Sequence, residues 1–265
     1  MDIIKRNFFC LLRTGALNDF TTLEPMSPYK WRRVMGMAQQ YQVEGAVLKG
    51  VKNHQYDRGI DFPNELFKLA DFTQGEDQAE AWNLSNRWLN KRLRQIRMKE
   101  PCSSNPSMET IGLLNLLVKG TRELMKGASM VSHTVALGQY LRRQNDRINK
   151  EKLAAWVGKT HLQGMVQLQM RMLVEFLDFQ AEELPLPLPM RKRDIKRIAQ
   201  QLNQPITGKE GDLHFWQDNN GLVRNNTQAL RRNLQRALRL LPYASLETLS
   251  YFSHHFILSL NELEE

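Results

Sequence analysis

The stretch S-M-E-T-I-G-L-L-N-L-L-V-K-G-T-R-E-L-M-K-G, residues 107–127, has the spacing of an amphipathic α-helix. Its apolar residues recur at intervals of three, four and seven, which gathers them on one helical face. They include Ile111, Leu114, Leu117, Val118 and Met125. Ser107 precedes the pattern, and serine is a favoured N-cap residue because its hydroxyl accepts from a free backbone N–H. The stretch therefore predicts a helix over residues 108–126.

The same helical periodicity continues on both sides of this stretch. It predicts helices over residues 3–17, 63–99, 128–145, 150–157, 160–179 and 191–202, helices that begin at Pro28 and Thr227, and a last helix capped by Ser245. No segment alternates convincingly with period two, which is the pattern of a half-buried strand. The expected fold class is therefore all-α, a bundle of about eight to ten helices with little or no sheet.

Three segments are predicted to be non-helical. Residues 50–63 contain the breakers Gly50, Gly59 and Pro63, and residues 203–226 are polar and contain glycine. The run L-P-L-P-L-P at 184–189 is typical of an extended spacer, since proline cannot donate to a sheet ladder.

The clearest break is E-P-C-S-S-N-P-S, residues 100–107, whose prolines and serines are typical of a loop. We expect an N-terminal helical region at 1–100, a linker at 101–107 and a C-terminal helical region at 108–265. The two regions are expected to pack as one globular unit.

A buried seam is expected to join the two regions. On the predicted 63–99 helix, apolar positions step by four and three, so one face should pack directly on the 108–126 helix. The seam residues on this face are Trp82, Leu89, Leu93 and Ile96.

Composition favours a folded, basic protein. Of the 265 residues, 42% are hydrophobic and 25% are charged, which is typical of a chain with a packed core. The formal net charge is +9, and a basic surface attracts nucleic acid, anionic lipid or acidic proteins.

Segments that would direct the chain to a membrane are not found in the sequence. No apolar run approaches the ~20 residues of a membrane helix, and the N-terminal run F-F-C-L-L is shorter than the ~7 residues of a secretory core. Cys10 and Cys102 belong to no C-x-x-C motif, so two reduced thiols are expected. We expect a cytoplasmic protein with no membrane partner.

Several loose motifs occur in a characteristic order. The N-terminal part contains F-F-C-L-L-R-T-G-A-L (8–17), S-P-Y-K-W (27–31), A-Q-Q-Y-Q-V-E-G (38–45) and N-L-S-N-R-W-L-N (83–90). The C-terminal part contains I-N-K-E-K-L-A-A-W (148–156), E-E-L-P (182–185), a glycine-containing loop (219–224) and L-P-Y-A-S-L-E-T-L (241–249). Together these motifs, which cover most of the chain, resemble the helical flanking regions of an uncharacterised nucleotidyltransferase family.

The chain departs from this family where a catalytic module would lie. Family members carry a mixed sheet with L-L-K-G and G-D-I-D-L between the two helical parts, whereas here residues 100–107 lead straight into the next helix. The family's G-I-G-L-R-Q…D pattern reads G-A-S-M-V-S-H-T-V at 127–135, so its arginine and aspartate positions fall on Val131 and Val135. The resemblance implies a nucleotidyltransferase-like protein with a degenerate active site.

The residues for a catalytic metal are not found either. Nucleotidyl transfer needs two magnesium-binding carboxylates on one face of a strand, hence Asp-x-Asp. Acid-x-acid occurs only at Glu210–Asp212, in a polar loop, and at Glu262–Glu264, in the tail. V-L-K-G at 47–50 and L-V-K-G at 117–120 are interpreted as helical segments whose likeness to a catalytic loop is accidental. We therefore expect no metal, no cofactor and no catalytic residues.

Two basic stripes are the remaining candidate site. They recur at intervals of three and four residues, and arginine forks bind phosphate in bidentate fashion. Two such helices could form a phosphate-binding trough whose affinity falls with salt, or they could be solvated helix faces. The stripe residues are Arg87, Lys91, Arg94 and Arg97, followed by Arg232, Arg236 and Arg239. Tryptophans could stack bases beside them or belong to the core, namely Trp82, Trp88 and Trp156.

Three functions stay open at this point. The favoured hypothesis is a non-catalytic, nucleotidyltransferase-like helical protein that acts in binding or scaffolding, with a protein partner that could carry the missing catalytic module. The first alternative is a basic helical protein that binds nucleic acid through the arginine stripes. The second is a divergent nucleotidyltransferase with magnesium-dependent transfer to an unknown substrate.

Overall fold

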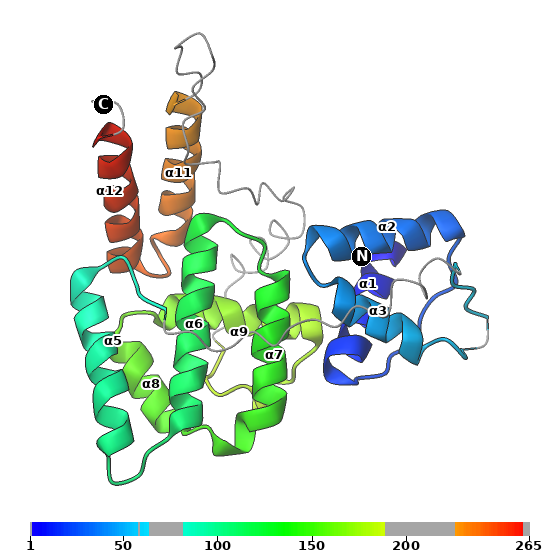
Figure 1. Ribbon diagram of the computed structural model, residues 1–265, viewed down its shortest axis with the longest axis horizontal. Coiled ribbons are helices and arrows are strands. Elements are labelled where there is room, and N and C mark those ends of the chain that lie inside the picture. The colour runs from blue at the N-terminus through cyan, green and yellow to red at the C-terminus, as the bar shows by residue number, and fades with distance from the viewer. Residues whose placement is uncertain (1, 58, 64–81, 189–225, 262–265) are drawn as a thin grey trace. The chain divides into compact units, whose positions relative to one another are not determined.

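The computed structural model describes residues 2–57, 59–63, 82–188 and 226–261. At 226–232, 255 and 257–261 it describes the backbone alone. Within these residues the protein contains ten α-helices and no strand (Figure 1). The predicted all-α fold class is confirmed. None of the helices in the described ranges is long and apolar enough to cross a membrane. The expected helix at 191–202 and the expected loop at 203–225 lie outside the described residues.

The helices form two compact units, each built from separate stretches of the chain. The described residues within 1–79, 130–146 and 171–184 form the first unit. Those within 80–129, 147–170 and 185–265 form the second unit. The expected linker at 101–107 thus lies inside the second unit, and the division of the chain at that segment stays a prediction.

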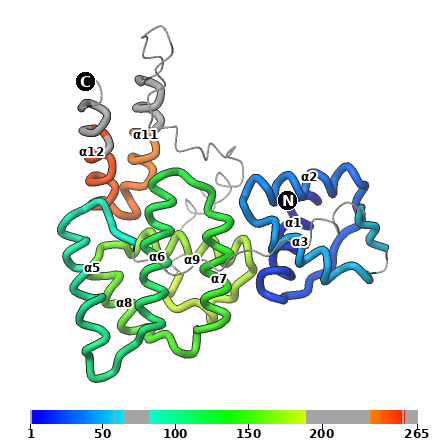
Figure 2. Tube along the Cα trace, in the orientation of Figure 1, coloured from blue at the N-terminus to red at the C-terminus, as the bar shows by residue number. Residues whose placement is uncertain are grey.

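The first unit is built around α1. It contains α1 Ile3–Leu17, α2 Pro28–Gln40, α3 Glu44–Asn53, α7 Val131–Gln144 and the C-terminal part of α9 Gln163–Leu177. Figure 2 shows α1, α2 and α3 as the blue segments that fold back on one another. Phe8, Leu11 and Leu12 of α1 are fully buried, and the ring of Phe9 stacks on that of Phe176 with centroids 5.3 Å apart. The unit is held by this apolar core.

Helices α1 and α3 approach each other closely because both have glycine at the crossing. A side-chain carbon built at Gly15 would lie 1.7 Å from the carbonyl oxygen of Ala46, and one at Gly50 would lie 2.1 Å from that of Leu11. Gly50 is therefore an interior residue of α3, which ends at Asn53, so the expected loop at 50–63 is wrong in its first four residues, while the described residues within 54–63 are non-helical as expected. The V-L-K-G stretch at 47–50 is helical, as interpreted from the sequence.

The second unit surrounds α6. It contains α5 Arg87–Lys99, α6 Met108–Lys126, α8 Lys150–Lys159, α11 Asn226–Leu240, α12 Ser245–Asn261 and the N-terminal part of α9. Gln169 of α9 donates through its side chain to the carbonyl oxygen of Leu117, 3.0 Å away. Helices α11 and α12 form an antiparallel hairpin, orange and red in Figure 1.

The expected long helix at 63–99 is wrong at its centre, because residues 82–86 are not helical and α5 begins only at Arg87. Asn90 closes the preceding turn by accepting from the backbone nitrogen of Leu84 and donating to its carbonyl oxygen. Asparagine commonly competes with the helical backbone in this way. The seam residues Leu89, Leu93 and Ile96 are buried as expected, whereas Trp82 is half-buried and precedes the helix.

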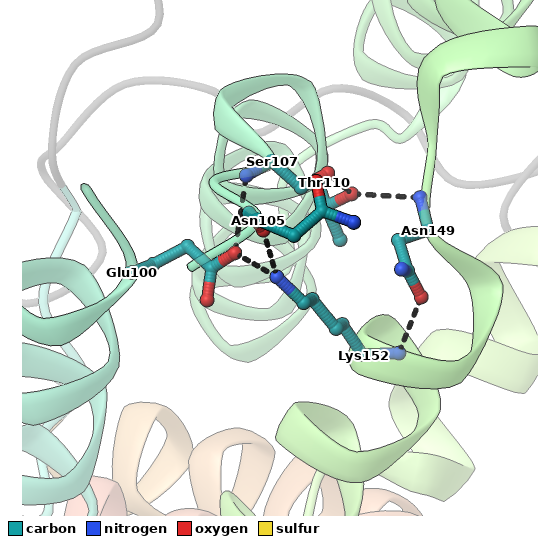
Figure 3. A network of polar contacts seen from close by, with 6 residues as sticks. All are labelled: Glu100, Asn105, Ser107, Thr110, Asn149 and Lys152. Atoms are coloured by element: carbon teal, nitrogen blue, oxygen red, sulfur yellow. Dashed lines mark hydrogen bonds and ion pairs between the residues drawn. The ribbon is translucent and has the colours of Figure 1, made fainter. Parts of the chain in front are cut away.

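Residues 101–107 are held in place by a polar network (Figure 3). The backbone nitrogen of Ser107 donates to the buried carboxylate of Glu100 over 3.0 Å, and the ammonium of Lys152 donates to the same carboxylate and to the carbonyl oxygen of Asn105. Ser107 is the N-cap residue of α6, but its hydroxyl is hydrogen-bonded to that of Thr110 and not to a backbone N–H.

Candidate phosphate-binding face

Helix α5 is strongly basic and starts at a well-defined cap. The side-chain oxygen of Asn86 accepts from the backbone nitrogens of Trp88 and Leu89 at 2.9 and 3.1 Å. Six of the thirteen helical residues are arginine or lysine and none is acidic. Most of them are good helix formers, and Leu89 and Leu93 anchor the opposite face in the core.

Three members of the first predicted stripe share the exposed face of α5. Arg87, Lys91 and Arg94 are all exposed. Within the described residues, none of the three makes a hydrogen bond or an ion pair. We name these three residues the basic face. The positive charges of the basic face therefore lie in solvent and are not neutralised by neighbouring described side chains.

Arg97, the fourth predicted member, is engaged inside the protein. Its Nε donates to the side-chain oxygen of Asn115 over 2.8 Å, and its Nη2 donates to the carbonyl oxygen of Trp82 over 2.6 Å. Burial lowers the pKa of Arg97 from its ordinary value. Arg97 lies ten residues after Arg87 and therefore about 80° around the helix from it. This rotation turns Arg97 away from the exposed face that Arg87 occupies.

The second predicted stripe, on α11, is described only in part. Arg236 is half-buried, and its Nη1 donates over 2.7 Å to the carbonyl oxygen of Lys126, near the end of α6. Arg239 is exposed, and the side chain of Arg232 lies outside the described residues. Helix α11 packs against α12 and α6, so the trough between the two stripes stays a prediction.

A smaller basic group that sequence reasoning missed surrounds Trp82. The ammonium groups of Lys119 and Lys126 lie 5.6 and 5.9 Å from the ring centroid of Trp82, within cation–π range. Arg122, on the same side of α6, donates to the carbonyl oxygen of Asn83 over 2.6 Å. In the sequence, Lys119, Arg122 and Lys126 are spaced by three and four residues, and this spacing indicates that they share one face of the helix. Their contacts attach the segment before α5 to α6.

Of the three tryptophans considered for base stacking, only Trp88 remains largely accessible, with 47% of its surface exposed, while Trp82 is half-buried and Trp156 is buried. The guanidinium carbon of Arg92 lies 3.4 Å from the centroid of the Trp88 ring. The ring of His161, in the turn after α8, lies 5.8 Å from it at an interplanar angle of 19°. Trp88 therefore borders the basic face of α5.

In the first unit, Thr14, His54 and Asp57 are arranged like a hydrolase triad. Thr14 Oγ1 and His54 Nε2 are 3.0 Å apart, and His54 Nδ1 and Asp57 Oδ2 are 2.6 Å apart. However, Thr14 has 0% exposure, and its hydroxyl donates to the carbonyl oxygen of Asp19. A hydroxyl that is buried and directs its proton at Asp19 is not a nucleophile activated by His54. The chain of hydrogen bonds fixes the end of α3 to α1.

The described residues contain no group of three or more histidine, cysteine, aspartate or glutamate side chains placed to hold a metal ion. Of the two acid-x-acid pairs in the sequence, Glu210–Asp212 and Glu262–Glu264, both lie outside the described residues.

Comparison with known proteins adds no assignment. No family model, no curated protein and no solved structure matches this chain.

Proposed function

We propose that the second unit binds nucleic acid, without catalysis, through the basic face of α5. The observation that supports this proposal is the exposure of Arg87, Lys91 and Arg94 on a helix that carries no acidic residue. The three cations span about 10 Å along the helix axis. That length corresponds to about three successive phosphates of one strand, at ~3.4 Å of rise each. Their guanidinium and ammonium groups would replace the counterions condensed on those phosphates.

The test is the affinity of the full chain for a labelled oligonucleotide, measured by fluorescence anisotropy over a series of salt concentrations. Release of about three counterions predicts a slope near −2 in a plot of log affinity against log salt for a single strand. Arg87→Glu/Lys91→Glu/Arg94→Glu is expected to weaken binding about 30-fold at ~100 mM salt and to flatten the slope.

The matched control makes the same change of net charge on the first unit. Arg32, Arg33 and Lys49 are exposed on α2 and α3, and their replacement by glutamate alters the total charge equally. The control triple variant is expected to bind within about threefold of the wild type. Equal losses in both triple variants would show that net charge alone attracts the oligonucleotide and would contradict the assignment to α5.

A protein-scaffolding role, which the resemblance to nucleotidyltransferase flanking regions implies, is the second candidate. It is favoured by large apolar side chains exposed on the α11–α12 hairpin, of which Leu238 is 60% exposed. Clusters of exposed apolar residues are typical of protein-binding surfaces. The exposed residues of this hairpin are Leu234, Leu238, Leu246, Leu249 and Phe256.

Affinity capture of the tagged protein from its own cells, with and without nuclease, tests this second candidate. Leu238→Glu is expected to reduce a nuclease-resistant, stoichiometric partner about tenfold, because it places a charge in an apolar contact. Gln235→Glu is the matched control, since Gln235 is an exposed residue of the same helix. A partner that is retained by both variants would place its contact elsewhere. Magnesium-dependent nucleotide turnover by the purified chain would instead support the transferase alternative.

A further inference from the structure

The indole of Trp88 has one covered face and one accessible face. Arg92 stacks on the ring at 3.4 Å, and its Nη1 lies 3.3 Å from Nε2 of His161. A histidine ring on the opposite face of the indole could not reach this guanidinium, so Arg92 and His161 lie on the same side. Trp88 is 47% exposed. Because Arg92 and His161 occupy one side of the ring, we attribute most of this exposure to the other face and the ring edge.

The covered side is supported by a second hydrogen bond. Nη1 of Arg92 also donates to the carbonyl oxygen of Lys159 over 2.7 Å, at the end of α8. This bond fixes the guanidinium between α5 and the turn that follows α8. A cation on one face of an aromatic ring leaves the opposite face available for stacking. The contacts of Arg92 and His161 restrict the ring before binding, which reduces the side-chain entropy lost when a base stacks on it.

His161 adopts a backbone conformation that would suit glycine better. Its φ is +53°, in the left-handed region, at the position after the α8 helix where glycine is usual. A residue with a side chain pays a cost of about 1 kcal/mol there. In return, the imidazole of His161 lies beside the Trp88 ring and within 3.3 Å of Arg92, a contact that glycine could not make.

From this geometry we infer that Trp88 stacks on an unpaired base, so that the face binds single-stranded nucleic acid in preference to duplex. The inference rests on the proposed function of the same face. Arg87 and Lys91 lie about 100° and 60° around the helix from Trp88, both on the same side of it, so a strand that follows the basic face brings its phosphates beside a base stacked on Trp88. Duplex bases are already stacked and hide their faces, whereas single strands offer a face at every base.

The experiment compares three probes with the full chain at ~100 mM salt: oligothymidylate of about 20 nucleotides, a duplex of similar charge, and inorganic polyphosphate, which has no bases. Trp88→Ala is expected to weaken oligothymidylate binding about tenfold and to change polyphosphate binding less than about twofold. Trp88→Phe, which keeps an aromatic face, is expected to recover much of the loss. Tyr56→Ala removes an exposed aromatic residue from the first unit and is expected to have no effect.

The outcomes separate this inference from the function on which it rests. If polyphosphate and oligothymidylate both bind, and Trp88→Ala changes neither affinity or both equally, the stacking inference is overturned while the basic face stands. If the wild-type chain binds neither probe, the proposed function fails and the stacking inference fails with it. Stronger binding of the duplex than of oligothymidylate would also overturn the preference for single strands.

A second measurement uses the wild-type chain and avoids any effect of substitution on folding. Oligothymidylate that contains 5-bromouracil is irradiated in the complex, and the cross-linked peptides are identified by mass spectrometry. A cross-link at Trp88 is expected, because a stacked base lies in contact with the ring. Cross-links confined to other peptides would overturn the inference even if every variant failed to fold.

His161→Gly separates a role of His161 in binding from a role in folding, because the two roles predict opposite effects of the substitution. Glycine relieves the left-handed backbone, so the variant is expected to be at least as stable as the wild type. Oligothymidylate binding should nevertheless weaken about threefold, since Arg92 loses the neighbouring ring that helps hold it on Trp88. Unchanged binding would show that His161 has no part in supporting the stacking face.

Discussion

Gly15→Ala is expected to destabilise the first unit by about 3 kcal/mol or more, the upper range for overpacking. The added methyl group would lie 1.7 Å from the carbonyl oxygen of Ala46 and 2.7 Å from the backbone nitrogen of Gly50. Both are main-chain atoms of a helix, so no rotamer change can relieve the contact. Helices α1 and α3 would have to separate, and α1 would lose its packing against α3.

The measurement is urea unfolding followed by circular dichroism, combined with hydrogen exchange of peptides from α1 and α3. Exchange in these two helices should accelerate, because their hydrogen bonds open together with the packing between them. Gly36→Ala is the matched control. Nothing lies within 4 Å of a side-chain carbon built at Gly36, an exposed position inside α2. This control is expected to stabilise the unit by about 0.5–1 kcal/mol, since alanine has the higher helix propensity.

Equal effects of the two glycine substitutions would contradict the close approach of α1 and α3. Gly50→Ala gives an independent check, because its added carbon would lie 2.1 Å from the carbonyl oxygen of Leu11. The effects of Gly15→Ala and Gly50→Ala should not add in the double variant, since both changes separate the same pair of helices.

The two glycines also show how far sequence reasoning reaches in this chain. Helical periodicity predicted the fold class and most of the helices, because the apolar faces of α1 and α6 have to be buried wherever they pack. The same rules treated Gly50 as a breaker. Glycine is needed at position 50 because the backbone of α1 lies against it. The contacting residue, Leu11, is nearly forty positions earlier in the chain, so no local sequence pattern could reveal this contact.

The segment before α5 is a second case in which local spacing was insufficient. Trp82 stands seven residues before Leu89, which fits a helical repeat, yet residues 82–86 are not helical. Asn86 caps α5 and Asn90 binds the backbone of Leu84. Asparagines close to a helix start favour such caps, so the sequence contained a signal for the true boundary that the apolar repeat outweighed.

For the candidate site, the sequence predicted the charges but not their partners. Arg87 and Arg97 belong to the same stripe by spacing, although Arg87 is exposed and Arg97 donates to Asn115 of α6. Arg236 likewise donates to the carbonyl oxygen of Lys126. Which arginine meets solvent depends on the neighbouring helices, so it could be read only from the fold.

Glu247→Ala is expected to lower the stability of the second unit by about 2 kcal/mol, because it leaves two part-buried backbone donors without a partner. Glu247, in the first turn of α12, has 1% exposure. Its carboxylate accepts from the backbone nitrogens of Ser85 and Asn86 at 2.6 and 3.0 Å. Asn86 also donates through its side chain to the hydroxyl of Ser250 over 2.7 Å. The first turn of α12 is thereby fastened to the start of α5.

Glu247→Gln is the matched variant, because the amide keeps an acceptor oxygen and removes the charge. A loss of about 1 kcal/mol is expected, since one of the two backbone donors would face the amide nitrogen. Hydrogen exchange of a peptide that covers residues 84–90 reports the connection directly. Exchange there should accelerate strongly in Glu247→Ala and weakly in Glu247→Gln.

The pH dependence of the same pair of proteins tests the electrostatics. Burial raises the pKa of Glu247 above its ordinary value near 4.5, although the bonds from Ser85 and Asn86 and the charge of Arg122 act in the opposite direction. The folded protein therefore holds this proton more tightly than the unfolded chain, and stability is lost as pH rises through the raised pKa. The free energy of unfolding of the wild type relative to Glu247→Gln should thus be greatest below about pH 4.5 and should decline above it.

Urea unfolding of the wild type and of Glu247→Gln at several pH values between about 4 and 8 measures this difference. Subtracting the two curves removes the titration of the other carboxylates, which is common to both proteins. A difference that grows with pH would mean that the two backbone donors and Arg122 outweigh the cost of burial, so that the ionised carboxylate stabilises the attachment of α12 to α5. A declining difference would mean that α12 is attached to α5 most firmly when Glu247 carries its proton.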